Sequence, residues 1–299
     1  MNILHYFYLA QWFVRARFFG RRAPLQTVLF ITDKCNLRCK HCSVYGSAGN
    51  HQRSFDDIVA DMRYSYELGS RFIDLEGGEP TLWKQDGRTI NDLIDAALEI
   101  GFFSITVTTN AQQDFSWIHP QSIWVSMDGV GKYHDAVRGE GAFARLEKNI
   151  AASGHKALSV NMVVNNLNYE CVAEALEYAR NNPAIKSISI NMHTPFPGTE
   201  HLALPQDIRE KVVDTVIAYK KKGYPIMNSV SGLKLMKHNN FKKECWVTNF
   251  IIQDGTRLTE CAGKTVGVCD KCGFCMAGEM RAVFSFKLDT ILAGLSLRM

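Results

Sequence analysis

The sequence predicts an α/β fold in which a parallel sheet curls into a partial (βα)6 barrel, followed by a small cysteine-rich C-terminal domain. Between residues 27 and 222, short apolar strands alternate with amphipathic helices. Beyond Gly223 this alternation gives way to a tail rich in glycine, lysine and cysteine. Because parallel strands need crossover connections, the alternation predicts a parallel sheet with its chemistry at the carboxyl ends of the strands.

Each element is predicted from its own pattern. The expected strands are Thr27–Thr32, Arg71–Leu75, Ser104–Thr109, Ser122–Met127, Leu158–Val164 and Lys186–Asn191. Ser54 and Thr89 are N-cap residues before helical patterns, and Gly101 stands just past the end of the second pattern. Pro205 suits the first turn of a helix that ends near Gly223.

Length and composition favour a main domain with an appendage. The chain has 299 residues, which is near the upper limit for a single core. We expect an N-terminal amphipathic segment over 1–25, the barrel over 26–231 and the cysteine-rich domain over 232–299. Apolar residues make up 46% and charged residues 21%, which excludes a disordered chain. A net charge of +4 is too weak to indicate nucleic-acid binding.

The nine cysteines are clustered. Three fall within residues 35–42 and five within 245–275, while Cys171 lies alone on a helical pattern as an expected buried thiol. No signal-peptide pattern is present, and clustered cysteines in a cytosolic chain are usually metal ligands. We therefore expect a cytoplasmic protein.

The first cluster reads Cys35-Asn-Leu-Arg-Cys39-Lys-His-Cys42 and follows the first strand. Three thiolates in one loop suit a [4Fe–4S] cluster with one iron left open, whereas a structural zinc site needs a fourth ligand. His41 could complete a zinc site, but it is poorly placed to do so as the immediate neighbour of Cys42.

The Cys-x3-Cys-x2-Cys spacing, with a ring at His41 before the last cysteine, resembles the signature of the radical S-adenosylmethionine (SAM) superfamily. Further motifs follow in that family's order across residues 26–200. Gly77-Gly78-Glu79 after the second strand is similar to its GGE motif, and Ser126-Met127-Asp128-Gly129 after the fourth resembles its Ser-x-Asp-Gly segment.

The resemblance implies a set of SAM-binding residues. Glu79 or a backbone carbonyl beside it would hold the SAM ammonium, and Arg138 would pair with the SAM carboxylate, unless it is an exposed loop residue. Asn165 and Asn191 end later strands and fit a strand-end cap better than a cofactor contact. The complete expected set is Gly77, Gly78, Glu79, Thr109, Asn110, Ser126, Asp128, Arg138 and Asn165. No catalytic residue is assigned.

The resemblance also implies a reaction. An electron from the reduced cluster would split SAM into methionine and a 5′-deoxyadenosyl radical, which takes hydrogen from an unactivated C–H bond. A flavodoxin- or ferredoxin-type protein would supply the electron. The substrate class stays open between a peptide, a lipid and a small molecule.

The second cluster contains Cys245, Cys261, Cys269, Cys272 and Cys275. Between Cys245 and Cys261 the sequence reads as a strand, an Asp254-Gly255 turn and a second strand. This layout resembles the auxiliary-cluster domains of the SPASM and twitch subgroups. One auxiliary [4Fe–4S] cluster would use four of these cysteines, with Cys272 as the expected spare; structural zinc is the alternative.

Two interpretations of the N-terminus remain open. The aromatic stretch Ile3–Val14, followed by Arg15, Arg17, Arg21 and Arg22, suits a helix at a membrane surface or a helix packed on the barrel, with packing slightly favoured. Residues 283–297 also have helical spacing and are expected to close the barrel or cover the auxiliary site. A non-catalytic iron–sulfur electron carrier or a zinc-bearing binding protein is the alternative function, but neither explains Gly77-Gly78-Glu79 and the segment 126–129 at strand ends.

Overall fold

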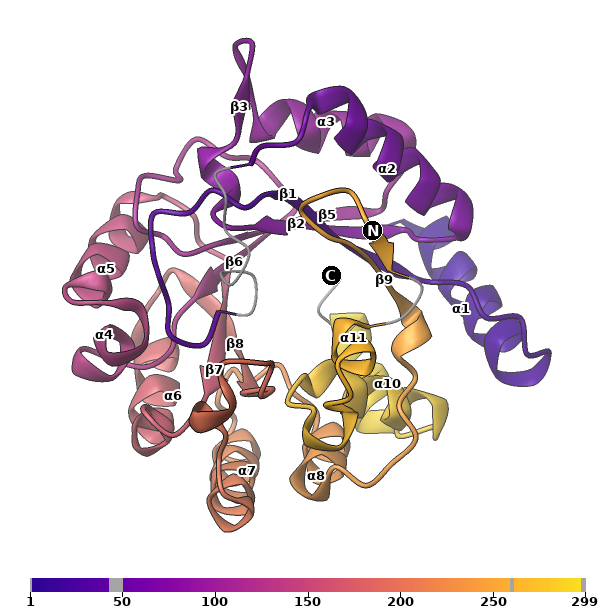
Figure 1. Cartoon of the computed structure of the whole chain (residues 1–299). Coiled ribbons are helices and arrows are strands. Elements are labelled where there is room, and N and C mark those ends of the chain that lie inside the picture. Colours follow the sequence, from indigo (N-terminus) through magenta and orange to yellow (C-terminus); the bar gives the residue numbers. More distant parts are fainter. Residues whose placement is uncertain (1, 43–50, 259–260, 297–299) are drawn as a thin grey trace.

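The computed structural model describes residues 2–42, 51–258 and 261–296. Strands β1, β2, β5, β6, β7 and β8 run parallel in that order, as predicted for a partial barrel. Helices cover the outer side of this curved sheet, and the arc stays open where α8, α10 and α11 lie (Figure 1). The strands of the sheet are β1 (Gln26–Thr32), β2 (Phe72–Gly77), β5 (Ser104–Thr109), β6 (Ser122–Ser126), β7 (Leu158–Val164), β8 (Ile185–Met192), β9 (Thr248–Ile251) and β10 (Arg257–Leu258).

The helices that connect the strands begin where the sequence predicts. The Ser54 side chain caps α2 and Thr89 caps α3 through a capping box, while Gly101 ends α3 in the left-handed conformation at φ 109°. A two-stranded ribbon of β3 (Lys84–Gln85) and β4 (Arg88–Thr89) precedes α3. The helices are α1 (Ile3–Phe18), α2 (Phe55–Leu68), α3 (Ile90–Ile100), α4 (Lys132–Arg138), α5 (Ala142–Ala152), α6 (Val172–Asn181), α7 (Gln206–Lys221), α8 (Val230–His238), α9 (Ala262–Thr265), α10 (Cys275–Phe284) and α11 (Leu288–Ser296).

Side chains alternate between the two faces of the sheet. Leu29, Leu75 and Val107 point outward into the main core beneath the helices and have no exposed surface. Their neighbours point into the barrel, where the Glu76 carboxylate accepts a hydrogen bond from Thr108 Oγ1 at 3.3 Å. This alternation leaves the inner face of the barrel polar and partly accessible.

The C-terminal region joins the barrel sheet, which the sequence does not predict. The Asp254-Gly255 turn connects β9 and β10 as expected, but β9 also pairs in parallel with β1. The expected domain boundary at 231/232 falls inside α8, which packs against α10. Strands β9 and β10 of the C-terminal region therefore extend the barrel sheet.

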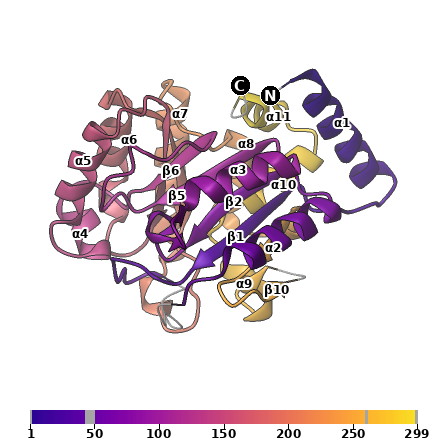
Figure 2. The ribbon, with the colours of Figure 1, turned by 90° about the horizontal axis from the view of Figure 1, so that it is seen from above.

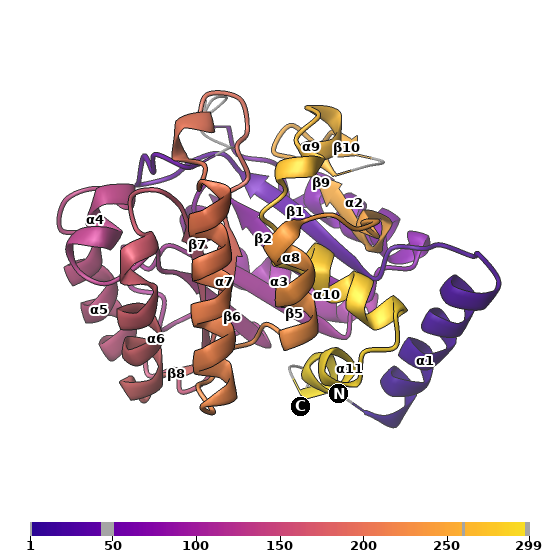
Figure 3. The ribbon, with the colours of Figure 1, turned by 90° about the horizontal axis from the view of Figure 1, so that it is seen from below.

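Different elements of the C-terminal region lie at the two ends of the molecule. The α9 helix and β10 lie at one end, and α11 lies with the start of α1 at the other (Figure 2 and Figure 3). No helix in the described part of the chain is long and apolar enough to cross a membrane.

Candidate SAM and iron–sulfur site

The first cysteine group lies in the loop directly after β1. The thiols of Cys35 and Cys42 interact electrostatically, as do those of Cys39 and Cys35, so the loop brings the three together. All three are partly buried. Burial raises the pKa of the Cys35 and Cys39 thiols, which means that metal binding there must displace protons.

Gly77 and Gly78 hold the start of this cysteine loop. Gly78 N donates to Thr32 O at 2.7 Å, and Glu79 N donates to Lys34 O at 2.8 Å. A Cβ on Gly77 would lie 2.2 Å from Thr32 O, and one on Gly78 would lie 2.3 Å from Lys34 O. Only glycine permits so close a backbone approach, and the approaching backbone is the chain's own cysteine loop.

The carboxylate of Glu79 accepts hydrogen bonds from the protein itself. Its carboxylate is only 1% exposed and accepts hydrogen bonds from Thr81 Oγ1 at 2.6 Å, Thr109 Oγ1 at 2.8 Å and Asn110 N at 2.7 Å. These donors belong to the protein, so Glu79 and Thr109 tie the end of β2 to the end of β5. The oxygens of Glu79 are thus engaged by protein donors, and the backbone carbonyls beside it are the other acceptors that the sequence predicts for the SAM ammonium.

Asn110 borders the cysteines, as expected for a residue of the site. Its Nδ2 donates to Asn36 Oδ1 at 2.7 Å and lies 3.7 Å from the Cys35 sulfur, within hydrogen-bonding range for sulfur. Ser126 ends β6 on the half-buried, inward-facing side of the strand. The structure thus places two expected polar residues at the mouth of the barrel.

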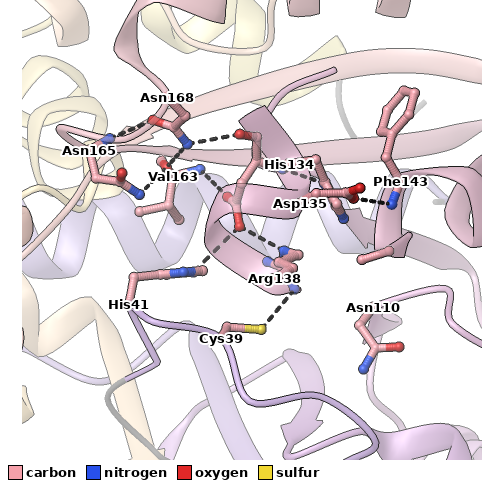
Figure 4. Close-up of polar contacts among 12 residues, drawn as sticks. Cys39, His41, Asn110, His134, Asp135, Arg138, Phe143, Val163, Asn165 and Asn168 are labelled. Atoms are coloured by element: carbon pink, nitrogen blue, oxygen red, sulfur yellow. Dashed lines mark hydrogen bonds and ion pairs between the residues drawn. The ribbon is translucent and has the colours of Figure 1, made fainter. Parts of the chain in front are cut away.

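Asp128 organises the opposite side of the cysteine loop. Its Oδ2 accepts a hydrogen bond from Arg138 Nε at 2.7 Å, and its Oδ1 accepts one from Val163 N at 2.9 Å. Arg138 Nη1 lies 3.8 Å from the Cys39 sulfur (Figure 4). Burial alone would raise the pKa of Asp128, but the guanidinium of Arg138 and other neighbours hold this pKa below its usual value.

This arrangement changes the expected roles of the pair. Arg138 is 9% exposed, so it is not a surface loop residue. Asp128 is fully buried and occupied by protein donors, which makes it a positioning residue for Arg138. A cation beside Cys39 stabilises its thiolate, and this is the contribution the described contacts support.

His41 offers an unused polar atom beside the cysteines. Burial lowers its pKa to about 4, so the ring is neutral at pH 7 and its 3.6 Å approach to Asp128 is not an ion pair. The buried His41 Nδ1 has no hydrogen-bond partner, and its ring lies edge-on to His193 at 6.5 Å. A buried polar atom without a partner needs an explanation, and a cofactor bound against this loop would provide one.

Asn165 forms hydrogen bonds within the turn that follows β7. Its Oδ1 accepts a hydrogen bond from Leu167 N at 2.8 Å, and its own N–H donates to Asn168 Oδ1 at 2.7 Å, so it caps the turn after β7 (Figure 4). Asn168, which is not among the residues expected from the sequence, also donates to Asp128 O at 2.8 Å. Its position three residues after the strand-end Asn165 was the available signal.

The thiols of the second cysteine group differ in the charged groups that lie near them. Burial raises the pKa of Cys245 to about 11, and the neighbouring thiols that raise it further are Cys261, Cys272 and Cys269. Burial raises the pKa of Cys275 to about 12, with the carboxylate of Glu279 as the next cause. Cys272, the expected spare, thus lies near Cys245, and Cys275 lies near both Glu279 and Cys272.

Cys275 and its surroundings connect this group to the barrel. Cys275 N donates to Asn191 Oδ1 at 2.8 Å, so the residue at the end of β8 anchors the start of α10. Arg209, buried on α7, donates from Nη2 to Cys272 O at 3.0 Å. Arg209 falls on the apolar face of that helix in the sequence, and a charged residue on an apolar face indicates a buried polar contact.

Neither cysteine group is arranged around a single ion. Among the described residues, no three His, Cys, Asp or Glu side chains are placed to hold one metal ion. The thiols of a cubane cluster each bind a different iron, so a cluster does not require such convergence. The donor set of three thiols, with Arg138 and Asn110 beside two of them, fits an iron–sulfur cluster.

A cavity lies between the two cysteine groups. Its volume is about 400 Å³, within the range of small-molecule sites, and it extends from the end of β8 to the loop around Asp270. Its polar lining includes His193, Glu200, Arg209, Asn239, Asp270 and Lys271. Asn239 is 8% exposed and its Oδ1 has no hydrogen-bond partner. The cavity therefore offers an unused acceptor to a ligand.

Comparisons with known proteins identify a family model and relatives of this chain. Residues 29–119 match the model of the radical SAM superfamily. A probable GTP 3′,8-cyclase of Saccharolobus islandicus is 26% identical over 204 residues, which cover 64% of this chain and 64% of that protein. A GTP 3′,8-cyclase of Actinobacillus succinogenes is 30% identical over 158 residues, or 48% of this chain and 46% of the relative. The chain thus spans less than two thirds of these relatives.

Solved structures share the fold at low identity. Streptococcus suis SuiB bound to S-adenosylmethionine superimposes with a TM-score of 0.64 at 18% identity, covering 81% of this chain and 61% of SuiB. The anSMEcpe structure with bound AdoMet and a peptide gives 0.61 at 16% identity, covering 80% of this chain and 74% of that one. At these identities the likeness shows a common fold, a partial barrel followed by a cysteine-rich region.

Proposed function

We propose, from the radical SAM superfamily domain that the chain carries at residues 29–119, that the protein cleaves SAM reductively and abstracts hydrogen from an unactivated C–H bond. The observation that carries this proposal is the cysteine loop after β1, held by Gly77 and Gly78 with Arg138 against Cys39. When bound, the reduced [4Fe–4S] cluster supplies the electron that splits SAM into methionine and a 5′-deoxyadenosyl radical.

The chain's own residues hold and tune this site. Cys35, Cys39 and Cys42 are the ligands, and three thiolates leave one iron for SAM. Arg138 offsets the negative charge at Cys39, while Asn110 donates toward Cys35. Both contacts favour thiolate over thiol, against the effect of burial.

The cavity between the cysteine groups is the candidate substrate site. It lies beside His193, whose ring approaches His41 in the first cysteine loop. Its opposite wall includes Val268 and Asp270, which flank Cys269. A peptide, a lipid or a small molecule with hydrogen-bond donors would find acceptors there in Asn239, Glu200 and Asp270.

GTP is a second candidate substrate, because the 26–30% identical relatives carry the name GTP 3′,8-cyclase. The inward-facing residues of β2 are Asp74 and Glu76, and carboxylates repel a triphosphate. Above the raised pKa of Glu76, about 7, its charge disfavours a triphosphate on the inner face.

The second cysteine group is proposed to hold an auxiliary [4Fe–4S] cluster through Cys245, Cys261, Cys269 and Cys272. A flavodoxin- or ferredoxin-type protein is proposed as the reductant. The free, clustered thiols suit a reducing compartment, so we place the protein in the cytoplasm.

The test is anaerobic reconstitution with iron and sulfide, followed by dithionite and SAM. The expected product is 5′-deoxyadenosine, measured by chromatography, and Cys39→Ala should reduce it to the level seen without protein. Cys171→Ala is the control for a cysteine outside both groups; Cys171 is buried and accepts a hydrogen bond from Val130 N, and its loss should leave the product well above the level of Cys39→Ala. Cluster-loaded wild type that yields no 5′-deoxyadenosine would overturn the proposal.

Adding GTP to the same reaction tests the second candidate. A cyclised GTP product would establish GTP as the substrate. Unchanged GTP alongside continued 5′-deoxyadenosine production would remove this candidate and leave SAM cleavage intact.

A further inference from the structure

The N-terminal helix α1 is apolar on both of its faces. On the inner face, Trp12 is 8% exposed and packs against Trp246 and Phe284. On the outer face, Ile3, Phe7 and Phe18 remain 83%, 70% and 62% exposed. A helix that is apolar on all sides is normally buried on all sides. The exposed outer stripe of α1 therefore suggests a binding surface.

The segment around α11 enlarges this apolar surface. Phe286, 49% exposed, contacts Phe13 and Phe18 of α1 at centroid distances of 5.6 and 6.2 Å. Leu288 and Leu292 of α11 are 73% and 64% exposed. The helix lies at the same end of the molecule as the start of α1 (Figure 2 and Figure 3). We call these exposed residues the α1/α11 surface: Ile3, Leu4, Phe7, Val14, Phe18, Phe19, Phe286, Leu288 and Leu292.

Positive charge borders the α1/α11 surface. Residues 1–32 contain no aspartate or glutamate, but they contain four arginines between positions 15 and 22. A cavity of about 420 Å³ opens beside this region, and its lining includes Arg17, Arg22, Lys242 and Arg281. The one carboxylate in its lining, Glu244, pairs with Arg281 at 3.4 Å. The cavity therefore presents unbalanced positive charge above the aromatic side chains of Trp246 and Phe286.

We propose that the α1/α11 surface docks on a membrane containing anionic phospholipids. The apolar stripe would enter the boundary between headgroups and acyl chains, and the cationic cavity would receive a lipid phosphate. A second copy of the chain is the less suitable occupant, because a two-fold contact through this surface would oppose arginines to arginines. Helix α9 and strand β10 lie at the other end of the molecule and stay clear of the membrane (Figure 3).

The test is co-sedimentation of the reconstituted full chain with vesicles. We expect binding to vesicles of equal parts phosphatidylglycerol and phosphatidylcholine, weaker binding to phosphatidylcholine alone, and several-fold loss between about 0.05 and 0.5 M salt. Phe7→Ser with Phe18→Ser should weaken binding roughly tenfold or more. Leu68→Ser with Leu98→Ser is the matched control, because these side chains are 38% and 40% exposed outside the α1/α11 surface.

A second pair of substitutions, Arg17→Glu with Arg22→Glu, tests the contribution of charge to vesicle binding. It should abolish the preference for phosphatidylglycerol. Lys148→Glu on the exposed side of α5 is its control. Inorganic phosphate at millimolar concentration should not release the bound protein, since the apolar stripe contributes independently; full release would assign the cavity to free phosphate and overturn membrane docking.

Point substitutions are preferable to deleting α1, because deletion would also uncover Trp246 and Phe284. Unchanged melting temperatures for the variants would show that the fold is intact. Absence of vesicle binding by the wild type at low salt would overturn the proposal. So would a dimer that Phe7→Ser with Phe18→Ser dissociates, because the surface would then be covered by a second copy.

Discussion

Glu76 shows how the inner face of the barrel affects a single residue. Its side chain points inward from β2, where burial, and then the charge of Asp74, raise its pKa from 4.5 to about 7. Between these values the folded state retains a proton that the unfolded state has lost. Stability contributed by this group is therefore full below pH 4.5 and is lost as the pH rises through about 7.

Glu76→Gln should accordingly stabilise the protein at pH 8 but not near pH 5. Allowing for partial solvent screening, we expect a gain of about 2 kcal/mol at pH 8 that shrinks toward zero near pH 5. Urea unfolding at the two pH values measures this difference. Equal stabilisation at both would show that packing, and not the carboxylate charge, is responsible.

At the residue scale, the sequence predicted where site residues lie better than what they contact. Glu79, Asp128 and Arg138 were expected to bind SAM because they follow strand ends in a recognisable order. In the structure, Glu79 binds the neighbouring strand end, and Asp128 binds Arg138. The contact of Glu79 with Asn110 joins segments 31 residues apart and depends on the packed sheet, about which a linear motif carries no information.

At the scale of elements, the strands were predictable because apolar alternation and turn residues are local signals. Ser104–Thr109 and Leu158–Val164 match their predicted bounds, and other strands differ by one or two residues at an end. The pairing of β9 with β1 was not predictable, since it joins residues more than 200 positions apart. Short edge strands carry little pattern of their own.

The cysteines around β9 and β10 give a prediction at the same scale. In a Cys35→Ala, Cys39→Ala, Cys42→Ala background, about half of the wild-type iron should remain, because the second group supplies its own site. Adding Cys272→Ala should remove this iron, whereas adding Cys275→Ala should leave it. Cys272 interacts with Cys261, while Glu279 is the leading charged neighbour of Cys275.

Iron and zinc analysis of the purified variants is the measurement. Stoichiometric zinc in place of iron would identify the second site as structural. Complete iron loss with Cys275→Ala but not with Cys272→Ala would reverse the assignment of the spare cysteine.

At the scale of the whole molecule, the barrel and the C-terminal region share one sheet and one buried cluster. Leu25 N donates to Val247 O at 2.8 Å, just before β1 and β9 begin their parallel pairing. Val247 and Phe284 are buried in a cluster with Trp12 and Phe72 from the other end of the chain. Removing the C-terminal region would leave β1 as an open edge and uncover this cluster.

A chain ending at residue 231 should therefore aggregate or lack a cooperative thermal transition. Size-exclusion chromatography and circular dichroism measure both properties. The matched control keeps every residue but carries a protease site inserted after Asn240, an exposed position in the loop following α8. After cleavage the two fragments should stay together, because β9 still pairs with β1 and α8 of the first fragment still packs against α10 of the second. A monomeric 1–231 fragment that melts cooperatively near the wild-type temperature would contradict a single folding unit, because the barrel would then fold without the partner strand that completes its edge.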